Sequence, residues 1–330
     1  MRRLPALNTL PAQAHSTGLS MQRPKLFVSG AAHIDRRGRI DGVYVPAASN
    51  PGSLREEAGG GALNAARNAV HHGVDVTLMS LRGGDLAGLA VADVLAESGI
   101  EDVSAIFLDR TTPSYTALLD PNGELIAGLA DMTLYELGFT RQLRRRKIRD
   151  AVAAADAVFC EANMPEDALM RLADMAGGRP IYAIAISPAK ARRLEPILAS
   201  LSCLFMNRRE ARVLSGADDA AEAIKLLRDR GLRRGVITAG GEETIFFDDT
   251  GVFNITPPQL EAIADVTGAG DALAGVATTA LMRGESFNEA VRRGMAAAML
   301  TIASPNVVAD YEDEAFETAL ARVGTPRKIS

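Results

Sequence analysis

The stretch Asp265-Val266-Thr267-Gly268-Ala269-Gly270-Asp271 directly precedes an alanine-rich segment, residues 272–282, that has the composition of a helix. The two glycines leave the backbone unshielded, so their amides can converge with the first free amides of that helix. Such an amide cluster binds anions, phosphate above all. We expect the carboxylate of Asp271 to be ionised at the positive end of the helix and able to accept a proton from a hydroxyl group. The stretch therefore predicts a site for phosphoryl transfer, in which a protein mainly positions groups and neutralises charge.

Short apolar runs alternate with helical segments along most of the chain. We expect strands near residues 26–29, 74–81, 157–160, 181–186, 203–206 and 235–238. Their alternation with helices predicts an α/β fold, with a mostly parallel central sheet that carries helices on both faces. Two segments interrupt the alternation, near 38–55 and 104–131. The second has a hairpin pattern around Pro121-Asn122-Gly123, and together the two predict a small additional sheet.

The composition excludes several classes of protein. The chain has 330 residues and a net charge of −5, which argues against a nucleic-acid partner. No apolar run reaches the length of a membrane span, so we expect no membrane partner. Cys160 and Cys203 are too few for a disulfide scaffold and indicate a reducing, cytoplasmic location. Residues 1–24 contain no secretory signal, and we expect a disordered tail there.

Neither of the common nucleotide-binding signatures is present. The sequence has no GxxxxGK[ST] motif and no GxGxxG fingerprint. Four elements in order instead resemble the motifs of the ribokinase-like (PfkB) sugar and nucleoside kinases. They are residues 59–66 with 83–88, Asn207-Arg208-Arg209-Glu210, Thr238-Ala239-Gly240-Gly241, and DVTGAGDALAG at 265–275. The resemblance implies a single ribokinase-like kinase domain over residues 25–330, with lid segments at about 36–55 and 104–132.

The resemblance also implies a role for each matched residue. Asp271 would be the base that deprotonates the acceptor hydroxyl, and the amides of Gly268, Ala269 and Gly270 would form an anion hole. Glu210, with Asn207, would hold Mg²⁺ through water. The residues implied along the phosphates of ATP are Thr238, Gly240, Gly241 and Thr267. A monovalent cation, K⁺, is implied near the anion hole.

Three segments narrow the resemblance to the pseudouridine kinase branch of the family: residues 49–52 (SNPG), 114–132 and 161–169. That branch phosphorylates the 5′-hydroxyl of pseudouridine. Sugar hydroxyls would then be held by Asp35, Gly60 and Asn64. The polar residues implied around the base are Ser114, Thr116, Asp131 and Asn163, since a planar base needs a cover with polar groups for its edges.

The chain departs from the family pattern at three places. A single acid, Asp85, follows two glycines where the family usually has two acids, and Glu243 stands where the nucleotide loop usually ends in glycine. Residues 184–186 (IAI) precede Ser187 where the pseudouridine kinase branch has Asp-Pro-Val. These departures bear on the identity of the substrate more than on phosphoryl transfer, because residues 265–271 are complete.

Two alternatives to a pseudouridine kinase stay open. One is a kinase of the same family for ribose, 2-keto-3-deoxygluconate, adenosine or another small sugar or nucleoside. The other is a ligand-binding protein that has kept the fold without turnover. In each case the partner is a small molecule, and the open edge of the additional sheet predicts a homodimer, because exposed edges need cover.

Overall fold

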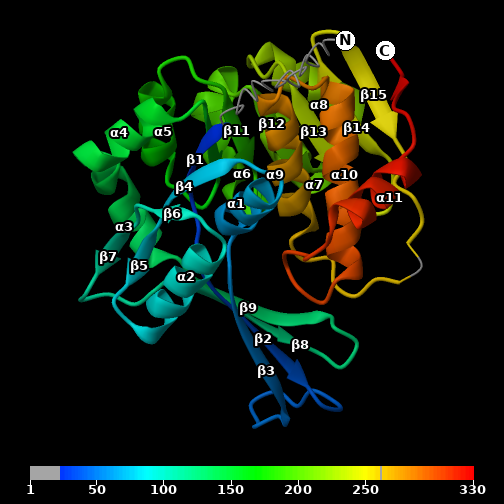
Figure 1. Ribbon diagram of the computed structural model, residues 1–330. Coiled ribbons are helices and arrows are strands. Elements are labelled where there is room, and N and C mark those ends of the chain that lie inside the picture. Colours follow the sequence, from blue (N-terminus) through cyan, green and yellow to red (C-terminus); the bar gives the residue numbers. More distant parts are fainter. Residues whose placement is uncertain (1–22, 261) are drawn as a thin grey trace, which may run out of the picture.

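A ten-stranded sheet forms the centre of the computed structural model, which describes residues 23–260 and 262–330 (Figure 1). Its parallel part follows the order β6 (Glu101–Asp102), β4 (Asp75–Met79), β1 (Lys25–Ser29), β10 (Ala157–Glu161), β11 (Ile181–Ile184), β12 (Cys203–Asn207) and β13 (Gly235–Thr238). The antiparallel continuation is β14 (Thr244–Asp248), β15 (Gly251–Ile255) and β16 (Arg327–Lys328). The predicted, mostly parallel sheet is confirmed. Of the predicted tail, residues 1–22 lie outside the described part of the chain.

Alternating side chains place this sheet between two hydrophobic cores. On β1, Leu26 and Val28 pack into one core and Phe27 packs into the other, which is why the strand is apolar without interruption. The first core is covered by α1 (Gly61–His71), α2 (Leu86–Glu97), α9 (Ala269–Met282), α10 (Phe287–Ala303) and α11 (Asp313–Arg322). The second is covered by α3 (Thr133–Gln142), α4 (Arg146–Ala154), α5 (Glu166–Ala176), α6 (Pro188–Ala191), a 3₁₀ helix (Arg192–Ser200), α7 (Arg208–Ser215) and α8 (Ala220–Asp229). Helices therefore cover both faces, as predicted.

A second sheet, here called the lid, has the strand order β3 (Gly52–Gly59), β2 (His33–Ile40), β8 (Ser114–Leu119) and β9 (Leu125–Asp131). Figure 1 shows it projecting from one end of the molecule. The first lid hairpin is longer than the predicted 36–55, because β2 and β3 stay paired over their whole length. The second predicted segment starts too early: β7 (Ala105–Phe107) pairs with β5 (Leu81–Gly83) in a separate two-stranded sheet.

Small residues let α1 and α9 approach each other closely. A Cβ at Gly275 of α9 would lie 2.5 Å from the carbonyl oxygen of Ala65 on α1, so the crossing accepts only glycine there. This close crossing brings Asn64 of α1 beside Asp271 of α9, although the two are 207 positions apart. The helix packing thus sets a polar contact at the edge of the sheet.

Two further sequence expectations concern the chain as a whole. Within residues 23–260 and 262–330, no helix combines the length and the apolar character needed to cross a bilayer. Cys160 and Cys203 are free and buried, and burial raises the pKa of both thiols, which makes them unreactive.

Candidate active site

A cavity of about 630 Å³ lies between the lid and the carboxyl ends of β11, β12 and β13. Ligands bind at this edge of parallel sheets, because the loops that follow the strands converge there. Most of the predicted site residues line it: Asp35, Gly60, Asn64, Asn163, Asn207, Glu210, Thr238, Thr267, Gly268, Gly270 and Asp271. A larger hollow of about 950 Å³, between β3, α1, α2 and residues 306–310, contains none of them.

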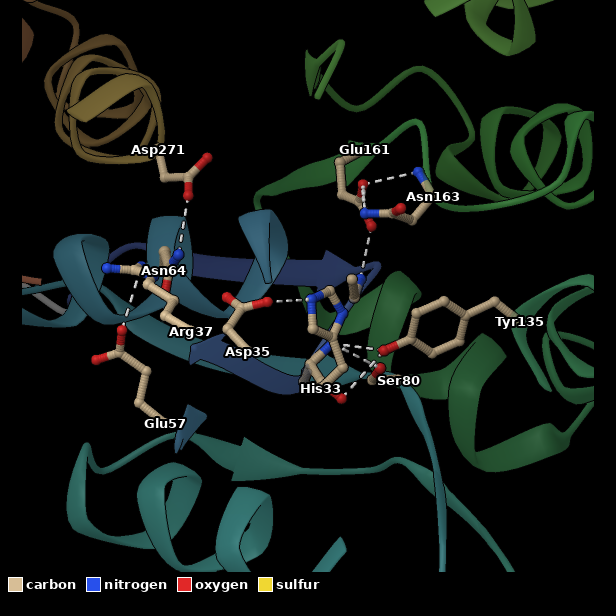
Figure 2. Close-up of polar contacts among 12 residues, drawn as sticks. His33, Asp35, Arg37, Glu57, Asn64, Ser80, Tyr135, Glu161, Asn163 and Asp271 are labelled. Atoms are coloured by element: carbon tan, nitrogen blue, oxygen red, sulfur yellow. Dashed lines mark hydrogen bonds and ion pairs between the residues drawn. The ribbon is translucent and has the colours of Figure 1, made fainter. Parts of the chain in front are cut away.

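Asp271 lies in the first turn of α9 and faces the cavity. The Nδ2 of Asn64 donates a 2.9 Å hydrogen bond to its Oδ2 (Figure 2), whereas its Oδ1 has no partner among the described residues. Burial raises the pKa of Asp271 to about 7, and the negative charges of Glu161, Asp35 and Glu210 act in the same direction. Burial therefore opposes the ionisation that we expect at the helix end, and the Asn64 hydrogen bond offsets this effect only in part. A pKa near neutrality is, however, what a general base requires.

The turn before Asp271 forms an open cluster of amides. Gly268 has a φ of 81°, and a Cβ there would lie 2.2 Å from the carbonyl oxygen of Val307, so the position requires glycine. Among the described residues, the amides of Gly268, Gly270 and Asp271 have no acceptor. Ala269 differs from the prediction: it does not line the cavity, and its amide donates a long, 3.4 Å bond to Val266. We call the three free amides the anion nest, since they can bind phosphate oxygens together.

Asp265 fixes the conformation of the turn that leads into the anion nest. Its Oδ1 accepts hydrogen bonds from both the amide (2.9 Å) and the hydroxyl (2.8 Å) of Thr267. Its Oδ2 accepts a hydrogen bond from Arg37 of the lid. The pKa of Asp265 is lowered because these hydrogen bonds and the Arg37 charge outweigh burial.

Asn207 and Glu210 close the start of α7 as a reciprocal cap. Asn207 Oδ1 accepts from the Glu210 amide at 3.0 Å, while the Glu210 carboxylate accepts from the Asn207 amide at 2.8 Å and from its Nδ2 at 2.9 Å. Burial raises the pKa of Glu210, since no described cation lies against it. Each of its oxygens accepts one hydrogen bond and so retains capacity to accept another. The carboxylate fits a Mg²⁺ ion held through water, which would supply the missing countercharge.

The predicted nucleotide loop lies between β13 and β14. Thr238 lines the cavity, but Gly240 and Gly241 are exposed and do not. A Cβ at either glycine would meet nothing within 4 Å, so the loop is open to a ligand. Glu243 is turned away to β15, where its Oε2 accepts a 3.0 Å hydrogen bond from Asn254.

At the lid end of the cavity, Asp35 of β2 accepts a 3.1 Å hydrogen bond from Nε2 of His33. His33 was not predicted as a site residue, yet it is buried, lines the cavity and has an Nδ1 without a partner among the described residues. Gly60, at a φ of 109°, gives the chain room to pass the Ala31 carbonyl oxygen, which a Cβ would approach to 2.6 Å.

A buried polar group next to His33 also escaped the sequence prediction. Glu161 accepts a 2.6 Å hydrogen bond from the Ala31 amide and two of 2.7 Å from the amide and Nδ2 of Asn163 (Figure 2). Lys190 of α6 donates to Oδ1 of Asn163 and lines the cavity. Burial lowers the pKa of Lys190, which the negative charge of Glu161 partly offsets. The sequence signals for Glu161 are its place at the end of a buried strand and in the segment 161–169, of which only Asn163 was assigned to the site.

The lid hairpin presents other residues than predicted. Tyr115 and Ala130 form a cross-strand pair and both line the cavity. Because successive strand residues point to opposite faces, the neighbouring pair Ser114 and Asp131 faces away, and Thr116 shares that face. None of these last three lines the cavity.

Ile186 follows β11 with a φ of 66°, in the left-handed region that a β-branched residue seldom adopts. It lines the cavity, and its Cδ1 would lie 2.2 Å from a Cβ at Gly61.

Asp85, the single acid of its motif, caps α2 and binds both the amide and the hydroxyl of Thr112. Its role is to hold the loop before β8.

Known proteins share both the sequence pattern and the fold. The pfkB family carbohydrate kinase profile matches residues 23–314. The pseudouridine kinase of Escherichia coli (strain K12) is 28% identical over 277 residues, which cover 82% of this chain and 88% of that protein. A carbohydrate kinase from Agrobacterium tumefaciens has 44% identity and a TM-score of 0.83, covering 93% of this chain and 100% of its own. Arabidopsis thaliana ribokinase, complexed with ribose and ATP, has 18% identity and a TM-score of 0.80 over 91% of this chain and 99% of its own, which confirms the ribokinase-like fold.

Proposed function

The chain belongs to the pfkB family of carbohydrate kinases, and we propose that it transfers the γ-phosphoryl group of ATP to the 5′-hydroxyl of a nucleoside, with pseudouridine as the preferred acceptor. One observation carries the proposal. A single cavity holds Asp271 with one unpartnered oxygen, the amides of the anion nest, and Asp35 at the lid end. These are the groups that a hydroxyl acceptor and a phosphoryl donor require.

In the proposed reaction, Oδ1 of Asp271 accepts the proton of the acceptor hydroxyl as its oxygen attacks the γ-phosphorus. A bond forms between that oxygen and phosphorus, the bond from phosphorus to the β,γ-bridging oxygen breaks, and ADP leaves. Asn64 holds Oδ2, so the carboxylate keeps one orientation. The anion nest stabilises the charge on the phosphoryl oxygens, and Asp271 later releases its proton to water.

For the nucleotide, we assign the phosphates of ATP to Thr238, Thr267 and the open loop at Gly240 and Gly241. Thr238 and Thr267 line the cavity from two different loops, and the glycines leave space beside it. Mg²⁺ would be held through water at Glu210 and would neutralise charge on the phosphates.

The lid end of the cavity suits a planar, polar ring. Tyr115, Met132 and Ile186 supply apolar walls, while Lys190 supplies a donor. Pseudouridine offers one ring N–H more than uridine, so a hydrogen-bond acceptor at this end of the cavity would distinguish the two. The relative named pseudouridine kinase supports this acceptor over a plain sugar.

The test is ATP-dependent phosphorylation of pseudouridine, uridine, adenosine, ribose and 2-keto-3-deoxygluconate by the purified protein, with Lys190→Met beside it. We expect kcat/KM for pseudouridine to exceed the others, and Lys190→Met to lower it while ribose turnover is unchanged. Preference for another acceptor would refute pseudouridine as the substrate but would leave the proposed phosphoryl transfer in place. No turnover, with thermal shifts on ligand binding, would show a protein that binds without catalysis.

A further inference from the structure

Among the ion pairs of the described residues, Arg37 is the one lid residue whose side chain contacts the turn before the anion nest. It lies on β2, and its guanidinium joins two carboxylates. Nη2 pairs with Oε1 of Glu57 on the neighbouring strand β3 at 3.2 Å (Figure 2), and Nη1 donates to Oδ2 of Asp265. The side chains of Arg37, Glu57 and Asp265 are only 20%, 25% and 29% exposed, so solvent screens these contacts weakly. Arg37 does not line the cavity.

The contact with Asp265 leads directly to the phosphate end of the site. The second oxygen of that carboxylate holds the amide and the hydroxyl of Thr267, which precedes Gly268. A shift of Arg37 therefore acts on the same carboxylate that fixes the turn into the anion nest.

The position of Arg37 along β2 links this turn to the acceptor. Asp35 and Arg37 are two residues apart on one strand, so their side chains share one face of the lid. Asp35 lines the cavity, and its cross-strand partner is Glu57, the residue that holds Arg37. One short segment of β2 thus carries both an acceptor contact and the link to Asp265.

We propose that Arg37 is a positioning residue that couples closure of the lid over the acceptor to the geometry of the anion nest. This inference rests on the proposed kinase function and goes beyond it. In the closed arrangement the guanidinium holds Asp265, and Asp265 holds the turn at Thr267. When the lid lifts, Asp265 loses its cationic partner and the nest is less ordered. Without acceptor the protein samples both arrangements, so the link forms only part of the time and ATP is hydrolysed slowly.

The neighbouring residue Arg36 provides a matched control. It lies on the opposite face of β2 and forms an equivalent lid pair, with Nε 2.9 Å from Oε2 of Glu56, but it does not contact Asp265. Arg36→Gln therefore removes a lid charge and one cross-strand pair without touching the link. Arg37→Gln removes both a cross-strand pair and the link.

The experiment compares these two variants with the same acceptor, whichever of the panel the wild type phosphorylates. We expect Arg37→Gln to raise the acceptor KM and lower kcat, each by about tenfold, as loss of a charged hydrogen bond implies. The KM for ATP should stay within about twofold, and Arg36→Gln should match the wild type. Equal kinetics for the two variants would overturn the proposal. Guanidinium at a low, sub-denaturing concentration should restore the activity of Arg37→Ala. It would not do so if the substitution had only damaged the fold.

A second measurement keeps the link testable if no acceptor is found. Spin labels at Ser53→Cys on the lid and Ala315→Cys on α11 report the lid position, because both sites are exposed and the native cysteines are buried. In the substrate-free protein, Arg37→Gln and Asp265→Asn should broaden the distance distribution to the same extent, and the double variant no further. Arg36→Gln should leave it unchanged. Additive broadening by Arg37→Gln and Asp265→Asn would show that the two residues act separately and would refute the link.

Discussion

The substitution Gly270→Ala is expected to strengthen the fold while it abolishes phosphoryl transfer. Gly270 is the second residue of α9, outside the left-handed region, and a Cβ built on it meets no atom within 4 Å. Alanine has the higher helix propensity by up to about 1 kcal/mol. In a chain of this size, the melting temperature should rise by about 2 °C.

The space in front of Gly270 is the cavity itself. A methyl group there occupies the volume through which phosphoryl oxygens reach the amides of Gly268 and Gly270. Removal of one donor from an oxyanion hole lowers kcat by about 10²–10³. We therefore expect kcat/KM to fall at least about 100-fold.

The assay pairs thermal unfolding with ADP release for the wild type, Gly270→Ala and Gly275→Ala. Gly275 lies in the same helix, but its Cβ would lie 2.5 Å from the Ala65 carbonyl oxygen, so that variant should lose stability. Activity of Gly270→Ala within about threefold of the wild type would refute the assignment of the anion nest. If Gly270→Ala loses as much stability as Gly275→Ala, the space in front of residue 270 is not open.

The acid limb of the pH profile should report the ionisation of Asp271, because only its carboxylate accepts a proton and burial raises its pKa to about 7. Below that pH, kcat/KM should fall about tenfold per pH unit. A profile that stays flat down to pH 5 would contradict the role of Asp271 as base. The same raised pKa stabilises the folded state below about pH 4, and that stability is lost as the pH rises through about 7. Urea unfolding should therefore show Asp271→Asn to be more stable than the wild type at pH 8 and not at pH 4. An equal difference in stability between the two proteins at both pH values would exclude a raised pKa of Asp271. Gly61→Ala should remove activity, since its Cβ would lie 2.2 Å from Cδ1 of Ile186 and 3.3 Å from Oδ1 of Asp271, and adding Ile186→Ala should restore part of it. If Gly61→Ala alone is active, the side chains of Ile186 and Asp271 can move away from the added methyl group.

The central sheet was predictable because each strand is buried on both faces. The apolar run Leu26–Val28 contributes to both hydrophobic cores, and such runs mark a parallel sheet between helices. The lid hairpin was found from Pro121-Asn122-Gly123, which forms the turn between β8 and β9. Which of its faces meets the cavity depends on register, and a shift of one residue exchanges Tyr115 for Ser114 and Thr116.

The motif residues of the site were predictable from the family resemblance, and for two glycines the structure shows why the motif contains them. Gly268 and Gly60 have positive φ values and close backbone neighbours, so no other residue fits. The ionisation of Asp271 was not predictable, since it depends on burial by distant segments. Lys190 lies on α6, and only the folded chain brings it to Asn163 and brings the Ala31 amide to Glu161.

Single-turnover phosphorylation by Asp271→Asn, alongside calorimetric binding of ATP and of the acceptor, tests the assignment of the base most directly. Asparagine keeps the shape of the side chain and its place at the anion nest but cannot take the proton. We expect the rate of phosphoryl transfer to fall about 10³-fold while both dissociation constants change less than about threefold. A rate within about tenfold of the wild type would show that another group accepts the proton.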